Sequence, residues 1–191
     1  MGWLDSFKRK PSATTILSMK LMNAAYQCGQ AFKDSINNKF GEETQDAMLS
    51  WSQVQYEFLF FFTHIAMRYA FERLGHEAIA KLQALLAPLL VDSTTEAWFG
   101  HWPDKFKAGI RKEFYHNINV AELEYSKCKK MFPEENEGTK DTLFWELGKN
   151  IARLSGYENN PAIIMHCLKV SVEQFKAMEL DNLIDAVGKE I

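Results

Sequence analysis

The stretch FLFFFTHIAM, residues 58–67, decides the fold of this chain of 191 residues. It lies between Glu57 and Arg68, and as a helix it is apolar on nearly every side. A helix that is apolar all round is buried all round. The stretch is also too short to cross a bilayer, which takes about 20 apolar residues. We therefore expect a soluble protein with a buried central helix over about residues 43–74.

Apolar residues recur at intervals of three and four along most of the chain, a spacing that is typical of amphipathic helices. The sequence has no strand-like alternation and no hairpin dipeptide such as Asn-Gly. The pattern predicts an all-α fold, a single-domain helical bundle of six to eight helices over residues 12–191. The expected helices cover residues 13–40, 43–74, 76–91 and 104–131, and three further helices begin near residues 139, 160 and 181.

Three signals set helix boundaries in the middle of the chain. Pro88 is expected to kink or end the helix that begins at residue 76, because proline has no N–H to donate. Residues 93–96, Ser-Thr-Thr-Glu, match a capping box and predict the start of a new helix. Asn119 followed by Glu122 is a cap pattern too, and predicts a break in the helix over 104–131.

The composition excludes several classes of protein. Hydrophobic residues make up 47% and charged residues 25% of the chain, which is ordinary globular usage and excludes a disordered chain. The net charge of −3 disfavours nucleic acid as a partner, because nucleic-acid binders are usually basic. The three cysteines are far apart and odd in number, which argues against a disulfide framework and favours a reducing, cytoplasmic location.

Known reaction motifs are missing from the sequence. It contains no Gly-x-Ser-x-Gly elbow, no phosphate loop and no dinucleotide-binding glycine pattern. Our leading hypothesis is therefore a protein that is not an enzyme, needs no cofactor, and binds a protein partner or itself as a homo-oligomer. The aromatic residues Trp98 and Trp102 are candidates for this surface, because tryptophan is enriched in binding hot spots. The alternative is that they form a hydrophobic corner of the core.

A second hypothesis is a small-molecule or cofactor pocket around His64. This histidine lies inside the apolar stretch, with Arg68 one turn later and Glu57 two turns earlier on roughly the same helix face. A few polar groups among buried aromatic residues are typical of ligand pockets. The alternative interpretation is a neutral histidine that is hydrogen-bonded to another helix.

A third hypothesis is a ferritin-like metal-dependent oxidoreductase. Glu113 and His116 have the Glu-x-x-His spacing that places two metal ligands on one helix face. The motif occurs once, whereas a di-iron site of this type uses it twice. The alternative is a surface Glu113 and a half-buried His116.

The N-terminal segment, residues 1–11, is amphipathic and basic. Trp3 and Phe7 share one face of a helical turn, and three basic residues follow at positions 8–10. The first six residues match the N-myristoylation pattern, and the basic cluster is the second signal that stable anchoring needs. The segment predicts a weak contact of residues 1–10 with an anionic membrane surface, and the alternative is a tail without a role.

Overall fold

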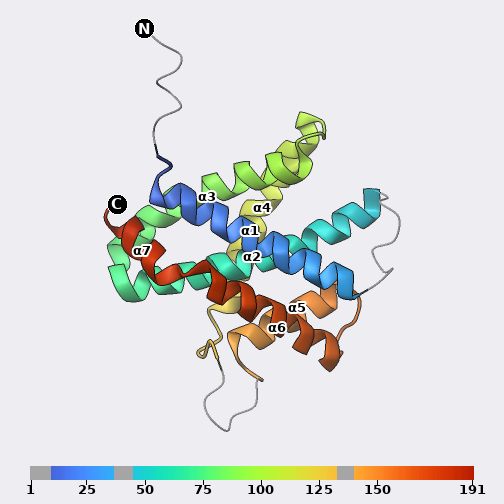
Figure 1. The fold of residues 1–191 in the computed structure, drawn as a ribbon. Helices are drawn as coiled ribbons and strands as arrows, with labels where there is room; N and C mark the ends of the chain where they lie inside the picture. Colours follow the sequence, from blue (N-terminus) through green and yellow to red (C-terminus); the bar gives the residue numbers. More distant parts are fainter. Residues whose placement is uncertain (1–9, 37–44, 133–139) are drawn as a thin grey trace.

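The computed structural model describes residues 10–36, 45–132 and 140–191, and this part of the chain folds into seven helices without a strand (Figure 1). The helices are α1 (Ala13–Ser35), α2 (Gln45–Leu74), α3 (His76–Phe99), α4 (Asp104–Tyr125), α5 (Leu143–Leu154), α6 (Pro161–Met178) and α7 (Leu180–Gly188). The predicted all-α bundle of six to eight helices is therefore confirmed. Among the described residues, no helix combines the length and the apolar character that a membrane span requires.

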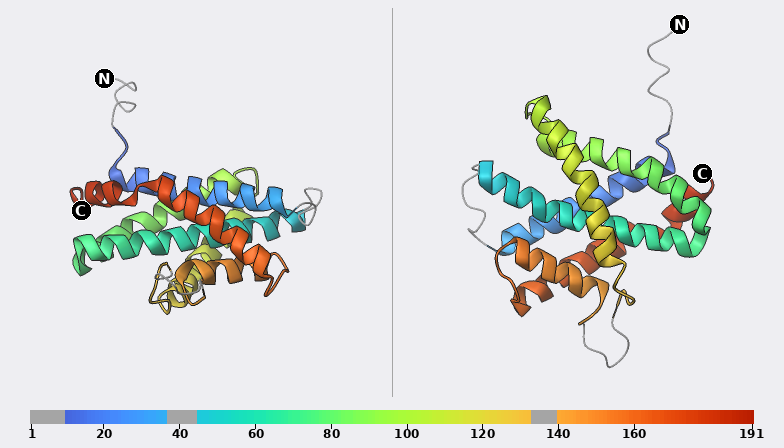
Figure 2. Two further views of the ribbon diagram at one scale, coloured as in Figure 1. Left: turned by 60° about the horizontal axis from the view of Figure 1, so that its bottom comes forward. Right: turned by 180° about the vertical axis from the view of Figure 1, so that it is seen from behind.

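Helix α2 is the centre of the bundle, as the apolar stretch predicts. All residues from 58 to 66 are buried, and α2 packs against α1, α3, α4, α5 and α7. Figure 2 shows α1 and α7 on one side of α2 and α5 on the other, while α6 crosses from α1 to α5. The prediction of a buried helix is too wide at both ends of α2, where Leu49 is 37% and Phe71 is 55% exposed.

An aromatic cluster joins three helices at the middle of α2. The ring of Phe61 makes edge-to-face contacts with Tyr125 of α4 and Phe144 of α5, with centroid distances of 5.5 and 4.9 Å. Phe62 adds a third such contact at 5.4 Å. Aromatic pairs favour this geometry, and each contributes about 0.5–1.5 kcal/mol beyond the area that it buries. The cluster therefore fixes α4 and α5 to the central helix.

The predicted boundary at Pro88 is wrong, because α3 continues through it to Phe99. The predicted capping box at residues 93–96 lies inside α3 and does not begin a new helix. Two of its residues, Thr94 and Thr95, are buried. Their buried hydroxyls donate to the carbonyls of Leu90 and Val91, one turn earlier, each at 2.6 Å. Serine and threonine inside a helix often satisfy their hydroxyls in this way. Packing of the buried helix face thus prevails over the local stop and start signals.

Caps at other helix ends follow the sequence more closely. The Ser12 side chain accepts a hydrogen bond from the amide of Thr15 at the start of α1, and Asn160 caps α6 with Pro161 in the first turn. In contrast, α4 runs unbroken through Asn119, so the predicted break is wrong. Two predictions concern residues outside the described part of the chain. One is the extension of the first helix beyond residue 36. The other is the role of the N-terminal segment, where the undescribed residues include Trp3 and Phe7.

Candidate functional site

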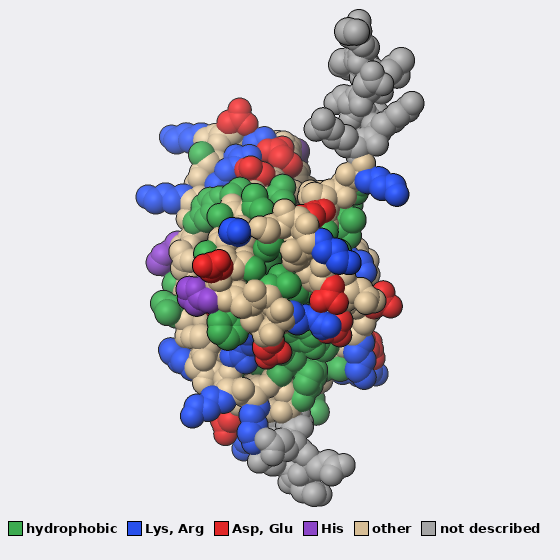
Figure 3. Space-filling model, turned by 90° about the vertical axis from the view of Figure 1, so that its left-hand side faces the viewer, with side chains coloured by type: hydrophobic (Ala, Val, Ile, Leu, Met, Phe, Trp, Pro, Cys, Tyr) green, Lys and Arg blue, Asp and Glu red, His purple; other side chains and the backbone are tan. Residues whose placement is uncertain are grey.

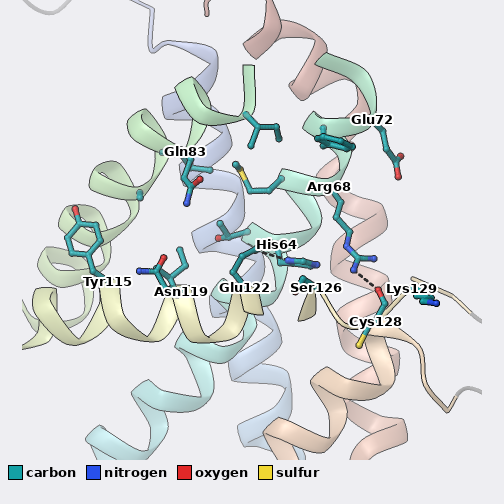
Figure 4. A pocket seen from close by; sticks show the side chains of 17 residues that line it. His64, Arg68, Glu72, Gln83, Tyr115, Asn119, Glu122, Ser126, Cys128 and Lys129 are labelled. Carbon is teal, nitrogen blue, oxygen red and sulfur yellow. Dashed lines mark hydrogen bonds and ion pairs between the residues drawn. The ribbon is translucent and has the colours of Figure 1, made fainter. Parts of the chain in front are cut away.

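A cavity of about 600 Å³ lies between α2, α3 and the second half of α4 (Figure 4). Its volume is in the range of small-molecule sites. One part of the wall is apolar and consists of Met67, Phe71, Ile79, Leu86, Ala87 and Ile118. The polar part consists of Thr63, His64, Arg68, Glu72, Gln83, Tyr115, Asn119, Glu122, Ser126, Cys128 and Lys129. The cavity therefore has the mixed lining that the second hypothesis requires.

His64 is buried in the wall of this cavity, with only 3% of its surface exposed. Its Nδ1 lies 2.7 Å from a carboxylate oxygen of Glu122, which comes from α4 (Figure 4). Since a carboxylate only accepts hydrogen bonds, Nδ1 carries the proton and donates. The other ring nitrogen, Nε2, is buried and has no hydrogen-bond partner among the described residues. His64, a residue of the cavity wall, therefore keeps a buried nitrogen without a hydrogen-bond partner among the described residues.

Arg68 follows one turn later and is held in place by the end of α4. Its Nη2 donates to the backbone carbonyls of Tyr125, at 3.0 Å, and Cys128, at 2.5 Å. These carbonyls lie at the negative end of the α4 dipole, where a cation is favoured. Within the described part of the chain, Arg68 forms no ion pair with a carboxylate. Its positive charge is thus available to an anionic ligand.

Glu57 does not join this cavity, although it lies on the same helix. One of its oxygens accepts hydrogen bonds from the hydroxyl of Tyr125, at 2.5 Å, and from the amide of Asn150, at 2.9 Å. It lines a second cavity of about 430 Å³ between α2, α4 and α5. Burial raises the pKa of the Glu57 carboxyl, and the two hydrogen bonds partly offset this rise. The structure therefore brings His64 and Arg68 together and places Glu57 elsewhere.

We expect Glu57→Gln to change how stability depends on pH. Because the pKa of Glu57 is higher in the folded state, the native protein holds this proton more tightly than the unfolded chain. The resulting stabilisation is complete below the unfolded value of about 4.3 and is lost as the pH rises through the folded value. Glutamine keeps the two hydrogen bonds without the charge. The melting temperature of the variant should therefore exceed that of the wild type increasingly between pH 4 and pH 8.

A suitable control for this prediction is Glu113→Gln. Glu113 lines the same second cavity but is exposed, so its replacement should leave the pH dependence of the melting temperature unchanged. Parallel curves for the wild type and Glu57→Gln across this pH range would contradict the prediction.

The two residues proposed as metal ligands, Glu113 and His116, are both exposed on α4. In residues 10–36, 45–132 and 140–191, no group of three or more histidine, cysteine or acidic side chains is arranged to hold a metal ion. The metal hypothesis stays a prediction that rests on two residues.

The aromatic residues around Trp98 and Trp102 pack partly against the core. Both tryptophans are half-buried, and the ring of Trp98 lies 4.8 Å from that of Tyr56. Trp102 contacts Phe106 at 5.2 Å, and Phe106 is itself 50% exposed. The most exposed aromatic residue of this group, Phe106, was thus missed by the sequence reasoning.

Glu122, the partner of His64, was missed as well. The sequence reasoning assigned it to a helix cap, because nothing local connects position 122 with position 64. Only the packing of α4 on α2 brings the two side chains within hydrogen-bond distance. The only sequence feature that could have indicated this contact is an acidic residue near the end of a long helix, and that feature is too common to identify a partner of His64.

The face of the molecule in Figure 3 gives little further guidance to function. On the face shown in Figure 3, acidic, basic and hydrophobic side chains are interspersed. Comparisons of the chain with protein-family models, with curated proteins and with solved structures found no match. Function must therefore be inferred from the chemistry of the cavity walls.

Proposed function

We propose that the protein binds a small amphipathic organic anion in the cavity between α2, α3 and α4. The observation that carries this proposal is the position of Arg68, a fixed cation without a carboxylate partner in the described part of the chain, beside an apolar wall. A carboxylate at Arg68 would form charge-assisted hydrogen bonds, which are about twice as strong as neutral ones.

The distribution of charged and apolar side chains on the cavity wall favours a ligand with one polar end and one apolar end. The arginine lies on the α2 side near the end of α4, while Ile79 and Leu86 of α3 provide hydrocarbon contacts. Burying apolar ligand surface there contributes about 25 cal/mol per Å². Lys129 is exposed on the cavity wall and adds a second positive charge. A medium-chain carboxylate such as decanoate combines these requirements and serves as the probe.

Decanoate should therefore bind about tenfold or more tightly than decanol or decyltrimethylammonium, measured by isothermal titration calorimetry. Ala87→Phe should weaken binding, because Ala87 lines the cavity and the larger ring would occupy part of it. Ala84→Phe is the matched control, since Ala84 is exposed on the same helix and does not line the cavity. The proposal fails if Ala87→Phe binds decanoate normally or if the cationic probe binds best.

Protein binding, the leading hypothesis from the sequence, stays a prediction. Trp3 and Phe7 lie outside the described residues, and Trp98 and Trp102 are half-buried. The cavity offers a more specific chemical argument than this surface does, and for that reason we favour ligand binding.

A further inference from the structure

The unused nitrogen of His64 restricts the chemistry of the ligand, on the basis of the proposed function. Because the N–H at Nδ1 donates a hydrogen bond to Glu122, a ring with a single proton has a lone pair at Nε2, which can only accept. Buried polar atoms nearly always have a partner, yet Nε2 has none among the described residues. The ligand is an obvious source of the missing hydrogen-bond donor.

Arg68, the neighbour of His64 on the cavity wall, needs a ligand group that accepts hydrogen bonds. A guanidinium has five N–H donors and no acceptor. Residues four apart on a helix lie on one face, with about 5–6 Å between their Cβ atoms. Figure 4 shows the ring of His64 and the guanidinium of Arg68 next to each other at one end of the cavity. The site thus places a cationic donor beside a ring nitrogen that has no hydrogen-bond partner among the described residues.

We propose that the ligands of this cavity are amphipathic hydroxy acids, with the carboxylate on Arg68 and a hydroxyl on the second or third carbon donating to Nε2 of His64. A hydroxyl at either carbon is close enough to the carboxylate to reach the neighbouring side chain. An unsubstituted fatty acid satisfies Arg68 but leaves Nε2 without a partner. An alcohol satisfies the histidine but leaves the guanidinium without an anion.

The competing arrangement is an imidazolium, in which Nε2 is protonated as well. His64 and Arg68 would then both be donors, and together they would favour any carboxylate without regard to a hydroxyl. Glu122, whose side chain is 49% exposed, is the acidic group in contact with the ring. The other charged groups on the cavity wall are the acidic Glu72 and the basic Arg68 and Lys129. Because two donors give a hydroxyl group no acceptor, an imidazolium would bind the hydroxy acids no better than decanoate, and this distinguishes the two arrangements.

The test compares four acids of equal chain length on the chain of 191 residues at pH 8 by isothermal titration calorimetry. We expect 2-hydroxydecanoate or 3-hydroxydecanoate to bind about tenfold more tightly than decanoate, the gain typical of one hydrogen bond to a buried group. 10-Hydroxydecanoate is the control, because it carries its hydroxyl at the far end of the chain. It should bind no better than decanoate.

In His64→Phe, the 2- or 3-hydroxy acid should bind no more tightly than decanoate does to the same variant, because the ring volume is kept while the acceptor is lost. The ligand series on the wild type tests the inference even if this variant does not fold. Equal binding of decanoate and both hydroxy acids would overturn it and leave the proposed function intact. Proton uptake on binding, measured in buffers of different ionisation enthalpy, would overturn it too. If none of the acids binds, the proposed function itself fails.

Discussion

Replacing Phe61 with alanine is expected to destabilise the protein by about 3–5 kcal/mol, the usual cost of removing a buried aromatic ring. Phe61 has no exposed surface and contacts aromatic rings of α4 and α5 as well as its neighbour Phe62. The cavity left behind cannot be filled without moving two helices. Since domains are stable by only about 5–15 kcal/mol, the loss should bring the protein close to unfolding.

Urea denaturation followed by circular dichroism measures this effect as a lower midpoint at an unchanged slope. Phe106→Ala removes the same ring from a position that is 50% exposed, and should cost less than about 1 kcal/mol. Similar losses for the two variants would mean that the ring cluster around Phe61 does not hold the helices together.

Replacing Arg68 with methionine is expected to weaken the binding of decanoate by about 10–100-fold. Hydrogen bonds to charged groups contribute about 1.5–3 kcal/mol, and each 1.4 kcal/mol is a tenfold change in affinity. Methionine keeps most of the hydrocarbon part of the side chain but carries no charge. The affinity for decanol, which lacks a charge to pair with the guanidinium, should change less than about threefold.

Lys129→Met is the matched control for this variant, because Lys129 is an exposed cation on the same cavity wall. Exposed ion pairs contribute about 0–1 kcal/mol, so its loss should weaken decanoate binding by fivefold at most. If Lys129→Met reduces decanoate binding as strongly as Arg68→Met does, the anion lies at the mouth of the cavity and not at α2.

The central helix was predictable because its signal is local. Residues 58–67 are apolar on every side of a helix, and only a position inside the bundle removes all those sides from water. The end of α3 was not predictable from Pro88 or from the capping pattern at 93–96. The burial of Leu86 and Leu90 on either side of the proline stabilises the helix beyond it.

Two of the three residues that the sequence suggests for a ligand site, His64 and Arg68, line one cavity. The spacing of Glu57 and His64 on one face of α2 indicated a shared site, yet Tyr125 from α4 lies between them. Its ring is 5.7 Å from that of His64, and its hydroxyl binds Glu57. The sequence of α2 alone cannot show that a residue of α4 separates Glu57 from His64.

Tyr125 gives the molecule a property that neither cavity has alone. Its hydroxyl belongs to the Glu57 cavity, while its backbone carbonyl holds Arg68 in the other. A ligand that draws the guanidinium away from the end of α4 would break its hydrogen bond to Tyr125, the residue whose hydroxyl binds Glu57 in the second cavity. If ligand binding changes the proton affinity of the Glu57 carboxyl by some factor, ionisation of that carboxyl changes the affinity for the ligand by the same factor.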